Sequence, residues 1–317
     1  MKGIICLGEA LIDFIPLDSD NITYQKSPGG APANVAVAVA KLGAKSSFLG
    51  KVGNDVLGHF MQDTLKHHGV DTTHMTLTDE ARTGVVFVTL DKQGERNFSF
   101  YINPSADRFL TTDELDDSLF TDNRVLHFGS ISLIGEPSKT ATMKAVKKAK
   151  ENGLIISYDP NLRLSLWPTV DQAKETIISM LGEADIVKIS EEELEFLTGE
   201  TDLELGIAKL VPFEIPVLLV TYGSKGSYVH TNGQTIHVPA MKVDTVDTTG
   251  AGDAFVSGVL YHLNEVTSSI SELSLKQWKE IVTFASVSGA LAASTRGAMT
   301  ALPTIEEVNT RLEQANK

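Results

Sequence analysis

The sequence predicts an α/β fold with a mostly parallel central sheet and a small separate β-sheet. From about residue 125 onward, short apolar runs alternate with amphipathic segments, which is the pattern of repeated βα units. Polar and glycine residues gather after the predicted strands, where open α/β sheets place their ligands. Residues 83–101 instead contain two consecutive strands joined by Asp91-Lys92-Gln93-Gly94, a hairpin that interrupts the alternation.

Length and composition set the first limits. The 317 residues with 42% apolar content are enough for one large α/β domain with an elaboration, or for two domains. No apolar run approaches the roughly 20 residues that span a bilayer, and the segment before Glu9 is too short for a signal peptide. The single cysteine, Cys6, excludes a disulfide framework, so we expect a reducing cytoplasm. The formal charge of -14 argues against partners such as nucleic acid or anionic membranes.

The N-terminal segment predicts a strand that leads toward a ligand. Residues 3–7 form a buried apolar strand, and residues 9–16 continue it with alternation, so that Asp13 projects from a strand end or bend. Residues of about 12–26 can join the hairpin strands in a β-lid over the active face. Phe98 and Phe100 lie on one side of the second hairpin strand, and they then need an apolar partner such as another subunit.

Two helices follow within the N-terminal third. The segment Gly29-Gly30-Ala31-Pro32-Ala33-Asn34 enters a helix through a glycine pair, and Gly43 ends it. Asn34 lies in the first turn, where its amide either caps a neighbouring group or binds a ligand. Residues 55–68 form a second, amphipathic helix.

The remaining chain predicts four further buried strands, at residues 125–129, 154–158, 186–189 and 217–221. Ser190 and Glu193 have the spacing of a capping box, so the simplest interpretation is that they begin a helix. Arg163 follows a strand end, where it is either a surface cation or a phosphate clamp.

The stretch from Asp247 to Phe255 carries the clearest signal for chemistry. Gly250 and Gly252 allow close approach of a ligand, and the apolar run after them makes their amides the first turn of a helix, where phosphate is favoured. Asp253 comes next. A kinase uses such a carboxylate to accept the proton of an attacking hydroxyl, whereas an Asp at a helix start can also merely stabilise the dipole. No Gly-Lys-Ser/Thr sequence closes the stretch, so it is not a Walker A loop.

Two stretches together resemble the paired signatures of the ribokinase-like (phosphofructokinase B type) sugar kinases, namely residues 29–34 with 43–53, and residues 247–253. Further segments fall in matching order: Asp13 and residues 103–107, 159–163 and 221–226. The resemblance covers nearly the whole chain. It implies a three-layer α/β/α sandwich, with residues 1–317 as a single ribokinase-like kinase domain and a discontinuous β-lid from about 12–26 and 83–102.

This resemblance also implies roles at the sugar and at the transferred phosphate. Asp253 is expected to take the proton from the sugar hydroxyl, while an anion hole is formed by the amides of Gly250, Ala251 and Gly252. Sugar hydroxyls are expected to bind Asp13, Gly30 and Asn34. Arg163 is expected to steady the acceptor or the phosphate.

The implied cofactors are ATP, Mg²⁺ and K⁺. The nucleotide is expected to be bordered by Lys188, Thr221, Gly223, Gly226 and Ser286. The monovalent cation is expected beside Asp247, Thr249 and carbonyls near Gly297. The family has an Asn-x-x-Glu element that is associated with magnesium. At this position the present sequence has Ser190-Glu191-Glu192-Glu193 instead. Glu193 keeps the acid, but the lost amide strengthens its interpretation as a helix cap.

Within the family, the sequences of residues 8–13, 30–34 and 162–168 are most similar to those of fructokinases. This similarity implies phosphorylation of D-fructose at its 6-hydroxyl by ATP. Ribokinase, 2-keto-3-deoxygluconate kinase and an inositol-catabolism kinase are the alternatives, because a few pocket side chains set the sugar. A non-catalytic sugar-binding regulatory protein is an alternative of another class, although Asp253 argues against it. The expected partners are the sugar, ATP and a second copy of the chain bound through the β-lid.

Overall fold

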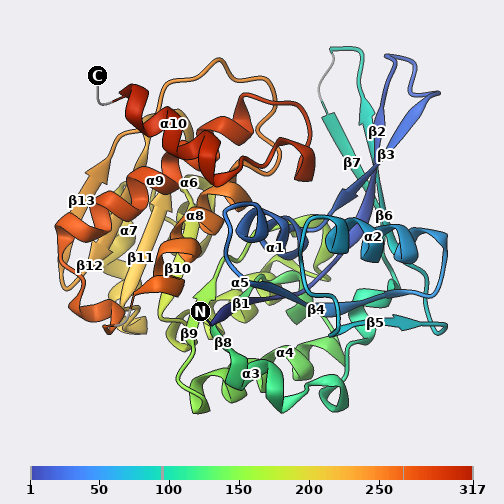
Figure 1. Cartoon of the computed structure of the whole chain (residues 1–317), viewed down its shortest axis with the longest axis horizontal. Helices are drawn as coiled ribbons and strands as arrows, with labels where there is room; N and C mark the ends of the chain where they lie inside the picture. The colour runs from blue at the N-terminus through green and yellow to red at the C-terminus, as the bar shows by residue number, and fades with distance from the viewer. Residues whose placement is uncertain (1, 94–95, 267, 316–317) are drawn as a thin grey trace.

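The computed structural model describes residues 2–93, 96–266 and 268–315 (Figure 1). Within these residues one large sheet has the strand order β13-β12-β11-β10-β9-β8-β1-β4-β5. Its strands are β1 (Gly3–Leu7), β4 (Ser46–Gly53), β5 (Met75–Thr78), β8 (Asn123–Phe128), β9 (Ile155–Tyr158), β10 (Ile186–Ser190), β11 (Val217–Thr221), β12 (Ser227–Thr231) and β13 (Gln234–Val238). The pairs from β5 to β11 are parallel, whereas β12 and β13 add an antiparallel edge. The predicted, mostly parallel sheet is therefore confirmed.

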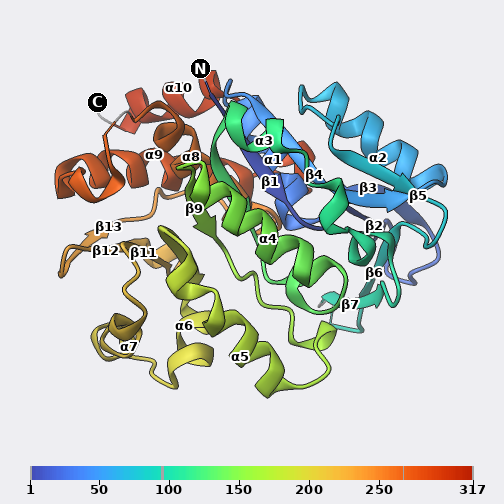
Figure 2. The ribbon, with the colours of Figure 1, turned by 90° about the horizontal axis from the view of Figure 1, so that it is seen from below.

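Helices cover both faces of this sheet, which gives the three-layer sandwich (Figure 1, Figure 2). One face carries α3 (Asp117–Asp122), α4 (Ser138–Glu151), α5 (Val170–Ser179), α6 (Glu191–Thr198) and α7 (Leu203–Leu210). The other carries α1 (Ala31–Lys41), α2 (Val56–His67), α8 (Ala251–Glu265) and α9 (Leu275–Ala293), with α10 (Ile305–Ala315) packed on α9. Strand β1 shows why both faces are apolar, since Ile5 and Leu7 enter the first core and Ile4 and Cys6 the second.

A second sheet projects from the body at the upper right of Figure 1. Its strand order is β3-β2-β6-β7, with β2 (Leu11–Pro16), β3 (Tyr24–Gly29), β6 (Gly84–Leu90) and β7 (Arg96–Tyr101). The small separate sheet expected from the hairpin is therefore present. Gly94 and Glu95 of the predicted hairpin lie outside the described residues.

One prediction about the N-terminal segment is wrong. Residues 9–16 do not continue the first strand, because the chain turns at Gly8, whose φ is 149°, and β2 joins the small sheet instead. Asp13 consequently projects from the small sheet and not from the end of β1. The second hairpin strand leaves Phe98 54% and Tyr101 67% exposed.

The fold brings the starts of α1 and α8 to the edge of the large sheet at which its parallel strands end. Helix α9 packs closely on α8, because a Cβ at Gly258 would lie 2.8 Å from the Cα of Ala285, and one at Gly289 would lie 3.0 Å from the carbonyl oxygen of Ala251. The first turn of α8 is thus supported from behind by α9. The capping box predicted for Ser190 with Glu193 is present, and Thr304 with Glu307 forms another at the start of α10.

Candidate active site

The first turn of α8 forms the centre of the site. Gly250 precedes the helix with φ 78°, a left-handed conformation that glycine adopts without strain, and Ala251 begins the helix. No side chain caps this turn, and the Ala251 N–H donates to the Thr248 carbonyl at 3.2 Å. The other amides of the turn and the helix dipole can bind an anion. Asp253 lies in the same turn and is 8% exposed. An anion site and a buried carboxylate are therefore immediate neighbours.

Asp253 is held from the start of α1. The Asn34 Nδ2 donates a hydrogen bond of 2.8 Å to the Asp253 Oδ2, and both side chains are buried. The Asn34 Oδ1 has no hydrogen-bond partner although it is buried. Asn34 can therefore hold the carboxylate with one end of its amide and accept a bond from a ligand hydroxyl with the other.

Burial sets the pKa of Asp253 more strongly than its position at a helix start. Amides at a helix start should keep its pKa low, but burial raises the pKa of Asp253 to about 6, opposed by the bond from Asn34 and reinforced by Asp159. Burial outweighs the amides because the carboxylate is shielded from water. At neutral pH the group remains largely ionised, and its raised pKa makes it a better proton acceptor.

A buried cation lies beneath the same turn. The Lys188 Nζ forms an ion pair of 3.0 Å with the Asp159 Oδ2. Burial lowers the pKa of Lys188, but Asp159 and Glu193 outweigh it, so the pKa is raised and the ammonium is charged. A Cβ at Gly252 would lie 3.5 Å from the Lys188 Nζ, which places this charge against the helix start.

Glu193 has a structural role in this network. Its Oε1 accepts a bond of 2.7 Å from the Leu162 N–H, and its Oε2 accepts one of 2.8 Å from the Ser190 N–H. Burial raises the pKa of Glu193, while Lys188 lowers it. Both carboxylate oxygens of Glu193 therefore accept hydrogen bonds from backbone N–H groups. Glu193 fits a magnesium site only if a water molecule lies between it and the metal. In the described part of the chain no group of three His, Cys, Asp or Glu side chains is placed to hold a metal ion.

The small sheet contributes Asp13. Burial raises the pKa of Asp13 to about 6, and Arg163 lowers it in part. A Cβ at Gly29 would lie 2.3 Å from the Asp13 Oδ2, so only glycine leaves room for this carboxylate. The guanidinium of Arg163 is exposed and donates to the carbonyl of Leu162 at 2.9 Å. Arg163 acts electrostatically on both carboxylates, because it also lowers the pKa of Asp253.

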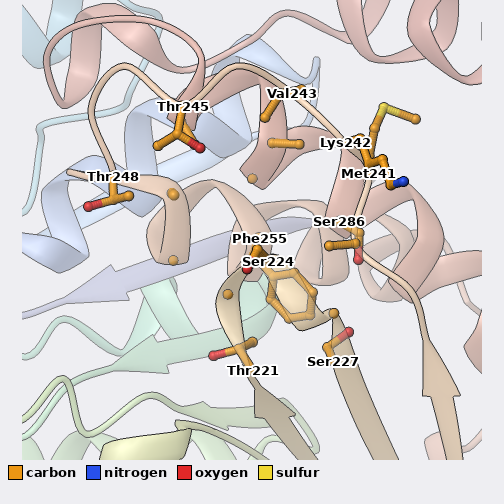
Figure 3. Close-up of a pocket in the computed structure, with 18 residues that line it drawn as sticks. Thr221, Ser224, Ser227, Met241, Lys242, Val243, Thr245, Thr248, Phe255 and Ser286 are labelled. Carbon is orange, nitrogen blue, oxygen red and sulfur yellow. The ribbon is translucent and has the colours of Figure 1, made fainter.

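A cavity of about 490 Å³ opens beside the first turn of α8. Its lining includes four of the five residues expected at the nucleotide, namely Thr221, Gly223, Gly226 and Ser286, together with Ala251 and Gly252. Lys188 is not part of this lining. Most other walls are apolar, and in Figure 3 Phe255 lies amid the labelled residues with Thr221 and Ser227 below it. The volume and walls suit a planar base with its phosphates directed at the α8 amides.

The three residues expected at the monovalent cation also lie together. The Asp247 Oδ1 accepts bonds from the Thr249 Oγ1 at 2.7 Å and the Thr249 N–H at 3.1 Å, and the Asp247 Oδ2 accepts one of 3.3 Å from the Gly297 N–H. Asp247 is buried, and it directly precedes the turn that leads into α8. Gly297 contributes its N–H and not a carbonyl, so the oxygens offered to a cation here are those of Asp247 and Thr249.

Sequence reasoning assigned no role to three further buried carboxyls, two of which, Asp159 and Glu9, interact with Asp253. Asp159 pairs with Lys188, and Glu9 and Asp107 interact with each other. Asp159 lies directly after a predicted strand, which is a signal that could have singled it out. Glu9 and Asp107 come from segments whose proximity depends on the two sheets meeting, so spacing along the chain gives no hint of it.

A phosphate at the α8 amides and a hydroxyl at Asp253 can meet within this one turn, which places the protein among the small-molecule kinases. A model described as pfkB family carbohydrate kinase matches residues 1–305. The chain therefore belongs to the pfkB family of carbohydrate kinases.

Individual relatives agree with this family. The chain is 48% identical to "Probable fructokinase-6, chloroplastic" of Arabidopsis thaliana over 98% of this chain and 83% of the relative. A crystal structure of fructokinase with bound ATP from Xylella fastidiosa superposes with a TM-score of 0.94 at 34% identity and covers 99% of both chains. A double-mutant fructokinase from Vibrio cholerae, bound to fructose, ADP and potassium ion, gives a TM-score of 0.89 at 41% identity over 98% of both chains.

Proposed function

We propose that the protein is an ATP-dependent fructokinase that phosphorylates D-fructose at its 6-hydroxyl. The observation that carries this proposal is the buried Asn34–Asp253 pair at the uncapped start of α8, beside a nucleotide-sized cavity. The choice of fructose rests on the relatives, which are named fructokinases at 48% identity and at TM-scores of 0.94 and 0.89. Ribose and 2-keto-3-deoxygluconate are the rival substrates.

The residues of the site divide the reaction into binding, proton transfer and charge stabilisation. Asp13, the Gly30 amide and the Asn34 Oδ1 bind sugar hydroxyls and orient the 6-hydroxyl toward Asp253. Asp253 accepts the hydroxyl proton as the oxygen attacks the γ-phosphorus, and the bond to ADP breaks.

Positive groups stabilise the charge that develops on the transferred phosphoryl group. The proposed donors to that charge are the amides of Gly250, Ala251 and Gly252 at the helix start, of which the Ala251 N–H donates to the Thr248 carbonyl in this structure. Lys188 adds a largely buried ammonium, and Arg163 approaches from the solvent side. The ion pair with Asp159 holds Lys188 in place before substrate binds, whereas the exposed Arg163 contacts the Leu162 carbonyl.

We also propose a magnesium ion and a potassium ion. Magnesium neutralises phosphate charge when it is bound, and water held by Glu193 is the contact that the protein offers it. Potassium is proposed beside Asp247, Thr249 and Gly297, where it would fix the direction of the amides that follow.

The remaining proposals concern organisation. We propose one kinase domain over residues 1–317 whose small sheet acts as a lid. We also propose a homodimer in which the exposed Phe98 side chains of two lids are buried together. Light scattering should give a dimer mass, and Phe98→Asp should give a monomer. A dimer that survives Phe98→Asp would place the interface elsewhere.

Among the described residues, no helix has the length and apolar character to cross a bilayer. With its single, buried cysteine the protein suits the cytoplasm, and we propose that location.

A coupled ADP-release assay with fructose, ribose, 2-keto-3-deoxygluconate and a nucleoside tests the proposed activity. We expect the highest kcat/KM with fructose and a 6-phosphate product. A higher value for another sugar would replace the substrate but keep the reaction class. Sugar binding without ADP release would instead support the non-catalytic alternative.

A further inference from the structure

Helix α1 starts without a cap of its own. Its N-cap residue is Gly30, which has no side chain, and the first turn contains no acidic residue. Glu9, from the segment between the two sheets, supplies the missing acceptor, because its Oε1 receives a hydrogen bond of 3.2 Å from the Ala31 N–H. Glu9 is 3% exposed, which is rare for a carboxylic acid.

The backbone around Glu9 touches the same helix start. A Cβ at Gly30 would lie 2.5 Å from the Glu9 carbonyl oxygen, and a Cβ at Gly8 would lie 2.6 Å from the Pro32 Cγ. Gly30 also accepts the first helical bond of α1, from the Asn34 N–H at 2.8 Å. Any shift of the Glu9 segment therefore moves Gly30 and Asn34 together.

Electrostatics favour the neutral form of this cap. Burial raises the pKa of Glu9 to about 8, its own N–H and that of Ala31 lower it, and Asp107 and Asp253 raise it further. Burial also raises the pKa of Asp107. At neutral pH Glu9 can therefore accept the Ala31 bond without adding a full negative charge beside Asp253.

We propose that Glu9 is a positioning residue for phosphoryl transfer: its carboxyl caps α1 and so fixes the Gly30 amide and the Asn34 side chain against the sugar and Asp253. The proposal rests on the proposed sugar-kinase function. Glu9 itself does not touch the reacting atoms. Its effect should fall on sugar binding and on the alignment of Asp253, and much less on the nucleotide.

The test compares Glu9→Gln with Glu9→Ala, with Asp116→Ala as a control. Gln resembles a protonated Glu and keeps the acceptor oxygen, whereas Ala removes it. Asp116 caps α3 on the opposite face of the sheet by accepting from the Ser118 N–H, so its loss removes a helix cap away from the site.

For Glu9→Ala we expect the fructose kcat/KM to fall about ten- to a hundredfold, chiefly through KM, with the KM for ATP within about twofold of wild type. Glu9→Gln and Asp116→Ala should both stay within about twofold for fructose. If Glu9→Ala keeps the wild-type KM for fructose, or if Glu9→Gln is as damaging as Glu9→Ala, the proposal is wrong.

Hydrogen exchange separates this proposal from the proposed function, because it requires no turnover. Amides at the start of α1 should exchange faster in Glu9→Ala than in wild type, and Glu9→Gln should retain their protection. Unchanged exchange in Glu9→Ala would show that Glu9 does not cap α1. A wild type that phosphorylates no sugar would reject the proposed function and the catalytic part of the inference, while the exchange result would still decide the cap.

Discussion

Replacing Asn34 by alanine should impair the site in two separable ways. The Asn34 amide donates to Asp253 at 2.8 Å, and its Oδ1 is buried without a partner. The first group stabilises the ionised form of Asp253, and the second is available to a sugar hydroxyl. Asn34→Ala removes both, so it should raise the pKa of Asp253 and weaken sugar binding.

The size of each effect follows from the hydrogen bonds. A bond to a charged group is worth about 1.5–3 kcal/mol, and about 1.4 kcal/mol corresponds to one pKa unit. The acid limb of kcat/KM should therefore move from near 6, the pKa of Asp253, to about 7–8. At pH values above both limbs the shift in ionisation no longer matters, and the lost sugar contact alone should lower kcat/KM about ten- to a hundredfold.

Steady-state kinetics with fructose between pH 5 and about 9 measure both effects. Asn264→Ala is a matched control, because Asn264 is also buried, donates from its Nδ2 to the Lys2 carbonyl at 3.0 Å, and has an unpartnered Oδ1. It should lose stability with an unchanged pH profile. If Asn34→Ala keeps the wild-type acid limb and kcat/KM, Asn34 plays no part in the reaction.

Three further predictions concern the charges of the site. The wild-type kcat/KM should fall below pH about 6, where Asp253 gains a proton, and a profile flat to pH about 4 would contradict this role. Lys188→Met leaves Asp159 buried without its ion pair, so it should lower both stability and kcat. The double variant with Asp159→Asn should regain stability but not kcat. If the double variant also regained kcat, the role of Lys188 would be structural only. Potassium should activate wild type with saturation at millimolar concentrations but not Asp247→Ala, and equal turnover in sodium or choline would exclude a potassium requirement.

The fold was predictable because its main signals are local. Buried strands followed by glycine and polar residues identify βα units, and the hairpin signal identified the small sheet. The assignment of the N-terminal strands to one sheet or the other was harder to predict from the sequence. The alternation of residues 9–16 resembles an extension of β1, and the turn at Gly8 that ends it depends on a backbone conformation that the pattern does not reveal.

The site could be predicted only where residue types carry the chemistry. The glycines around Asp253 indicate an anion site, and Asn34 was identified because it is a polar residue in an apolar helix start. Their contact joins positions 219 residues apart, and only the packing of α1 on α8 brings them together. The raised pKa of Asp253 could not be predicted for the same reason, since burial is a property of the folded molecule.

Asp253→Asn tests the proposed mechanism most directly, because asparagine keeps the size of the side chain but cannot take the proton. Folding raises the pKa of Asp253 to about 6, so the ionised group destabilises the fold above that pH, and the variant should melt at the wild-type temperature or higher. We expect kcat to fall by about 10²- to 10⁴-fold or more, with ATP affinity near wild type. A variant that is less stable or binds ATP more weakly, yet keeps its kcat per folded molecule, would show that Asp253 only begins a helix and is not the catalytic base.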